Sequence, residues 1–71
     1  MSEIIFVIEE DPTDGGFVAR ALGQGITTQA ETIDELKRMI LDAVRCHFDN
    51  PEDRPRLIRL HFVHEEVLAA S

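Results

Sequence analysis

The sequence predicts a small α+β domain in which three strands are followed by one helix and a fourth strand. Before position 32, one continuously apolar segment and two alternating segments are separated by two glycine-containing turns. A T-x-x-E box then opens an amphipathic stretch, and a further alternating segment follows a proline-containing loop. At 71 residues there is room for one domain, residues 1–71, because chains of this size bury only about 60% of their unfolded surface.

The first two strands are predicted to form a hairpin. Residues 4–9 are apolar at nearly every position, which indicates a strand buried on both faces. Turn-forming residues fill positions 11–16, and the Asp14-Gly15 dipeptide is a preferred hairpin turn. Residues 17–22 then return as the second strand.

A polar third strand and the helix come next. Residues 26–31 alternate Ile, Thr and Ala with Thr, Gln and Glu, and this polarity favours an edge strand. The helix is predicted to begin at Thr32, whose hydroxyl accepts an early backbone N–H while Glu35 reaches back to the cap. A single apolar stripe suits packing on one sheet face. The stripe consists of Ile33, Leu36, Ile40, Ala43, Val44 and His47 or Phe48.

The fourth strand is predicted at residues 56–66, after an ordinary connecting loop at residues 49–55. A strand-helix-strand connection within one sheet is almost always right-handed. We therefore expect a β-β-β-α-β fold whose mostly antiparallel sheet has the strand order 3-2-1-4, with one helix packed on one face.

The other face of this sheet has no second helix to cover it. It is predicted to carry Ile5, Val7, Val18 and Leu22, the candidate oligomer face. Cys46 is the only cysteine, so no internal disulfide compensates for the small core. We expect a homo-oligomer, most simply a dimer. The alternative cover is the segment at 67–70 folding back as a helical turn, although four residues bury little area at about 25 cal/mol per Å².

Net charge restricts the possible partners. Fourteen acidic residues against seven basic ones give a formal charge of -7, which opposes binding to phosphate backbones. We expect no direct nucleic-acid ligand. The carboxylates Glu9, Glu10, Asp11 and Asp14 form a candidate surface for a basic partner, and a solvated turn is the alternative interpretation.

No targeting, metal-binding or catalytic pattern is predicted. The N-terminal apolar run lacks a basic region before it and breaks at Glu9, so we expect no membrane segment and a cytoplasmic location. His61 and His64 project to opposite faces of a strand, and the adjacent Cys46 and His47 diverge on a helix. We expect no metal, no cofactor and no enzymatic activity.

The order of these elements resembles the N-terminal domain of the HicB antitoxin family. The matching segments are IIFVIEEDPTDGGFVARAL, GQGITTQAE and TIDELKRMILDAV, and the resemblance covers residue 3 to about residue 50. The family commonly has a Pro-Gly-Cys-like element where this chain has Leu22-Gly23-Gln24-Gly25, which leaves the subgroup open.

The resemblance implies a partial ribonuclease H-like sheet and a partner, HicA, which is a small RNA-cleaving toxin that the antitoxin masks. Many members carry a further helix-turn-helix or ribbon-helix-helix that binds the operator. This sequence contains neither, so we expect a stand-alone HicB-like domain without a DNA-binding extension. The alternative is a toxin-independent homo-oligomeric structural or regulatory module, including one that binds a small effector between subunits.

Overall fold

A computed structural model describes residues 2–71. Its strands are β1 (Glu3–Glu10), β2 (Phe17–Ala21), β3 (Thr27–Ala30) and β4 (Leu57–Phe62), and its helix is α1 (Ile33–His47). A short 3₁₀ helix, η1 (Pro51–Asp53), lies between α1 and β4. The predicted β-β-β-α-β order is confirmed.

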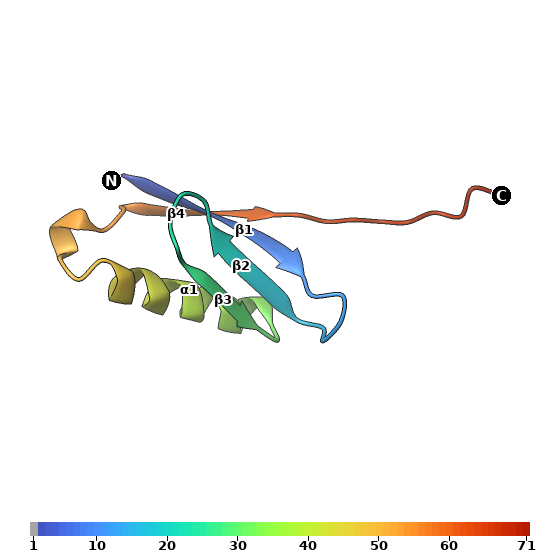
Figure 1. The fold of residues 1–71 in the computed structure, drawn as a ribbon, viewed down its shortest axis with the longest axis horizontal. Coiled ribbons are helices and arrows are strands. Elements are labelled where there is room, and N and C mark those ends of the chain that lie inside the picture. Colours follow the sequence, from blue (N-terminus) through green and yellow to red (C-terminus); the bar gives the residue numbers. More distant parts are fainter. Residues whose placement is uncertain (1) are drawn as a thin grey trace.

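The four strands form one mixed sheet in the order β3-β2-β1-β4. β2 is antiparallel to both β1 and β3, whereas β4 lies parallel to β1 on its other side. Figure 1 shows α1 running along one face of this sheet. The predicted strand order, 3-2-1-4, and the single covering helix are therefore confirmed.

The core lies between α1 and the sheet. On β1 the even-numbered residues Ile4, Phe6 and Ile8 are buried, and register places Phe6 opposite Ala21 and Ile8 opposite Ala19. The helix contributes three buried residues with helical spacing, as the apolar stripe predicts. These are Leu36, Ile40 and Val44.

The prediction that β1 is buried on both faces is wrong for the single chain. Ile5 and Val7 alternate with the core residues and are only partly buried, because no helix or strand among residues 2–71 packs over their face. Three strands also end earlier than predicted. β4 ends at Phe62 rather than residue 66, and its last backbone bond to β1 is from Val63 N–H to Ile8 O, 2.9 Å. β2 and β3 likewise end one residue short of the predicted limits.

Both ends of α1 are capped by side chains. Thr32 Oγ1 accepts the Glu35 N–H at 3.1 Å, which confirms the predicted N-cap. The second half of the capping box is absent, because no hydrogen bond joins the Glu35 carboxylate to the cap within residues 2–71. At the other end, Arg54 Nε donates to Phe48 O at 2.9 Å, so the loop predicted as an ordinary connection is anchored to the helix.

The segment after β4, residues 63–71, has no helix or strand and runs on in line with β4 (Figure 1). It gives the molecule its long dimension of 55 Å, against 20 and 19 Å across. Val67 and Leu68 are 87% and 84% exposed. The alternative in which this segment folds back as a helical turn is therefore wrong.

Candidate protein-binding surfaces

The turn between β1 and β2 is organised by Asp11. Its carboxylate accepts the backbone N–H of Thr13 at 2.9 Å and of Asp14 at 3.2 Å. These two hydrogen bonds, the one from Thr13 first, lower the pKa of Asp11 from its ordinary value of 3.8. Asp11 therefore remains a fixed negative charge in the exposed turn.

Gly16 holds the turn against the end of β3. Its φ of +79° is one that residues with a side chain rarely adopt. A Cβ at this position would lie 2.6 Å from the backbone oxygen of Ala30. The close approach brings the hairpin next to Glu31, the residue after β3.

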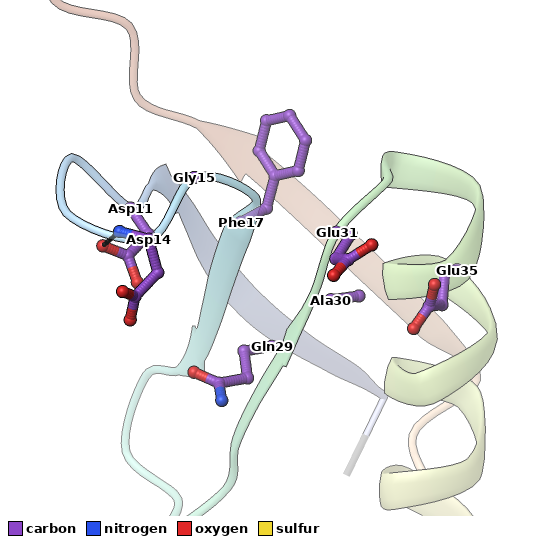
Figure 2. A pocket seen from close by; sticks show the side chains of 8 residues that line it. All are labelled: Asp11, Asp14, Gly15, Phe17, Gln29, Ala30, Glu31 and Glu35. Atoms are coloured by element: carbon purple, nitrogen blue, oxygen red, sulfur yellow. Dashed lines mark hydrogen bonds between the residues drawn. The ribbon is translucent and has the colours of Figure 1, made fainter.

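These contacts create an acidic pocket of about 530 Å³ at this end of the sheet. Figure 2 shows Asp11 and Asp14 on the hairpin, with Glu31 after β3 and Glu35 on the first turn of α1 across from them. Neither lysine nor arginine lines the pocket. The complete lining is Asp11, Asp14, Gly15, Phe17, Gln29, Ala30, Glu31 and Glu35. Four carboxylates that face a shared open space suit a cationic surface on a partner.

The predicted acidic cluster divides between two places. Asp11 and Asp14 line the acidic pocket, but Glu9 and Glu10 do not. Glu9 Oε1 lies 3.3 Å from Arg20 Nη1, in an exposed ion pair that offsets its charge. Glu9 and Glu10 both border a separate hollow formed with the segment after β4.

The face of the sheet away from α1, here called the open face, carries all four residues predicted for it. Register places Leu22 beside Ile5 and pairs Glu9 with Val18 on this face, with Val7 in the centre. Leu22 is 57% exposed and the other three are partly buried. Ion pairs of Glu3 with Arg59 and of Glu9 with Arg20 border this apolar centre.

The structure also contains an apolar groove between α1 and β4 that was not predicted from the sequence. Its volume is about 200 Å³, and its lining is Lys37, Ile40, Leu41, Ile58 and Leu60. The helix packs mainly over β3 and β2, so the β4 side of the same face is left incompletely covered. The sequence alternation identifies Ile58 and Leu60 as inward-facing, but it does not reveal which strands the helix covers.

Two observations bear on metal ions and membranes. Within residues 2–71, no three His, Cys, Asp or Glu side chains gather in a group that could hold a metal ion. No helix in the part of the chain that the structure describes has the length and apolar character needed to cross a membrane.

Two curated proteins are similar to this chain. A protein of Archaeoglobus fulgidus described as "UPF0150 protein" is 56% identical over 54 residues, which cover 76% of this chain and 77% of the relative. A protein of Thermotoga maritima with the same description is 40% identical over 67 residues, which cover 94% of this chain and 91% of the relative. No family model matches the chain. No solved structure matches it either.

Proposed function

We propose that this chain, which belongs to the UPF0150 family, is a non-catalytic HicB-like binding domain that masks a small basic RNA-cleaving toxin. The acidic pocket carries the proposal. Its four carboxylates come from the hairpin, the end of β3 and the start of α1, and no basic side chain among the lining residues neutralises them. The resemblance of residues 3 to about 50 to the N-terminal domain of HicB antitoxins supports the same partner chemistry.

Charge gives the pocket a role in recognition. A nuclease that binds RNA presents a cationic surface to phosphates. A domain with a formal charge of -7 and an acidic pocket attracts such a surface and competes with RNA for it. Masking of this kind needs no chemistry from the domain itself.

The test uses the product of a short basic reading frame next to the gene for this chain. The two purified proteins are mixed, and the cleavage of a labelled RNA is followed as the amount of domain rises. We expect cleavage to stop at an equimolar ratio. A nuclease that binds nothing and remains fully active in excess domain contradicts the proposal.

A matched pair of triple variants locates the surface. Asp14→Asn, Glu31→Gln and Glu35→Gln remove three charges from the acidic pocket, and they should weaken binding by about tenfold or more at low salt. Asp49→Asn, Glu52→Gln and Asp53→Asn remove three charges beyond the opposite end of α1 and should leave affinity unchanged. Equal weakening by both variants contradicts a specific role for the pocket.

The open face favours a second candidate function, a toxin-independent homo-oligomeric module. Ile5, Val7, Val18 and Leu22 form an apolar centre inside a charged border, an arrangement typical of protein interfaces. Unlike the toxin-masking function, this candidate predicts that the chain self-associates through the open face when no basic protein is present. Sedimentation of the wild-type chain beside Leu22→Glu measures it.

A further inference from the structure

β4 is the end strand of the sheet, and in the described part of the chain, residues 2–71, no strand lies beside its outer backbone edge. Leu57 N–H donates to Ser2 O at 3.1 Å and Val63 N–H to Ile8 O at 2.9 Å, so odd-numbered residues direct their backbone groups toward β1. Backbone groups alternate in direction along a strand, so the even-numbered ones face outward. Those residues are Ile58, Leu60 and Phe62. A free edge with this apolar character is prone to pair with another strand.

The apolar groove lies directly against this edge. Ile58 and Leu60, whose backbone groups face outward, also form one wall of the groove, and Leu41 of α1 forms part of the other. Leu41 is 48% exposed, and Phe62, which follows along the same face of β4, is 50% exposed. A strand added beside β4 would therefore find both hydrogen-bonding groups and an apolar surface for its side chains.

Residues 63–71 have the length and composition of such a strand. They do not reach the groove of their own molecule. They continue away from β4 (Figure 1), so the groove of the same chain lies behind them. Of the residues that favour chain reversal, Gly, Pro, Asn, Asp and Ser, residues 63–70 contain none. Its apolar Leu68 is 84% exposed in the single chain. A second copy presents the same groove without requiring a reversal.

Side-chain parity agrees with this pairing. If residues 63–71 keep the alternation of β4, Leu68 and Ala70 point to the α1 side and their backbone groups point outward, like those of Leu60. A twofold axis perpendicular to the sheet makes the pairing antiparallel and preserves the faces. Leu68 then lies opposite Leu60 of the second copy, and Ala70 opposite Ile58 of the second copy.

The single chain exposes more surface than a compact monomer of its mass, and the excess is close to the area that a partner buries in a dimer interface. The folded chain exposes 5492 Å², whereas a compact monomer of 8.0 kDa exposes about 4,450 Å². The excess is roughly 1,000 Å², and each partner in a standard interface buries about 800 Å². The segment after β4 and the uncovered groove account for the excess as one interface.

We propose that residues 63–71 of one copy add an antiparallel strand to β4 of a second copy, with Leu68 in the α1–β4 groove, and that reciprocal exchange closes a twofold dimer. Glu66 shares the face of Leu68, and Lys37 on the groove lining supplies the opposite charge. The dimer does not depend on the proposed toxin. It leaves the acidic pocket, at the β3 side of the sheet, accessible.

Matched leucine variants test the proposal by sedimentation and native mass spectrometry. Leu68→Glu should raise the dimer dissociation constant by about a hundredfold, because it replaces an apolar contact with Leu41 and Leu60 by a charged group in both symmetric halves of the interface. Leu22→Glu makes the same change at an exposed leucine of the open face and should leave the dimer intact. A monomeric wild-type chain overturns the proposal, as does a dimer that Leu22→Glu dissociates and Leu68→Glu does not.

Amide hydrogen exchange provides an independent readout of the same strand pairing. The amides of Ile58, Leu60 and Phe62 should be protected at high protein concentration and exchange freely in Leu68→Glu. The Leu57 amide donates to Ser2 O and the Val63 amide donates to Ile8 O. Both amides should therefore be protected in both proteins. Free exchange of the three outward amides in a wild-type dimer contradicts strand addition at β4.

Discussion

The hairpin lies against the end of β3 at Gly16. The first prediction concerns the stability of the domain when this residue is changed. Gly16→Ala should destabilise the domain by about 3 kcal/mol or more, because positive φ costs about 1–2 kcal/mol and the new Cβ would also meet the Ala30 oxygen at 2.6 Å. Gly15 has a similar φ of +76°, but a Cβ added there would have nothing within 4 Å of it.

Gly15→Ala is therefore the matched control, with an expected cost of only about 1–2 kcal/mol from backbone strain. Urea denaturation of both variants measures the difference. Equal losses of stability would show that the contact with β3 is unimportant.

Only two of the four carboxylates in the acidic pocket could be identified from the sequence. Asp11 and Asp14 are identifiable from the sequence because a turn dense in Asp and Gly is a local pattern. Glu31 and Glu35 are distant in sequence from the hairpin, and only the approach of Gly16 to the end of β3 brings them near it. The helix-cap pattern pairs the Glu35 side chain with Thr32, whereas in the structure Glu35 lines the pocket instead.

The C-terminal end of α1 is the element for which the structure predicts an unexpected contribution to stability. Arg54 donates to Phe48 O at 2.9 Å and to Arg45 O at 3.5 Å, two carbonyls at the end of the helix. Arg54→Met keeps much of the side-chain volume but removes these donors. It should lower the free energy of unfolding by about 1.5–3 kcal/mol, the usual scale for a hydrogen bond to a charged group.

Arg56→Met is the control, because Arg56 is exposed and its side chain makes none of the hydrogen bonds found in residues 2–71. Chemical denaturation followed by circular dichroism compares the two variants. If Arg56→Met costs as much as Arg54→Met, loss of positive charge rather than loss of the helix cap explains the effect.

The strands and the helix were predictable from local residue patterns. The residues at which the strands end were not. The hairpin turn at residues 11–16 and the right-handed strand-helix-strand connection led to the correct strand order. The three- and four-residue spacing of Leu36, Ile40 and Val44 led to the correct helix face. The predicted fourth strand extends to residue 66, but its pairing with β1 ends at Ile8 and Phe62, so β4 ends there. Strand ends depend on the neighbouring strand, which a single segment does not encode.

The molecule as a whole is more extended than a compact domain of its length. Its radius of gyration is 14.1 Å, against about 11 Å for 71 compact residues, and the segment after β4 accounts for the difference in shape. Within residues 2–71, its core contains nine buried apolar residues, and these lie between α1 and only one face of the sheet. Folding and association are therefore expected to be coupled, since a second chain buries what the first leaves exposed.

Coupling of this kind predicts that the melting temperature depends on protein concentration. A hundredfold increase in concentration strengthens association by about 2.7 kcal/mol, which for a unit of two such chains corresponds to a rise of roughly 5–10 °C. Differential scanning calorimetry over that range measures the rise. Below its raised dimer dissociation constant, Leu68→Glu should melt at a temperature independent of concentration, because its side chain is 84% exposed in the single chain and the charge harms only the dimer. A wild-type melting temperature that is equally independent of concentration would mean that the one-sided core is sufficient by itself, and that the exposed groove and the segment after β4 contribute nothing to stability.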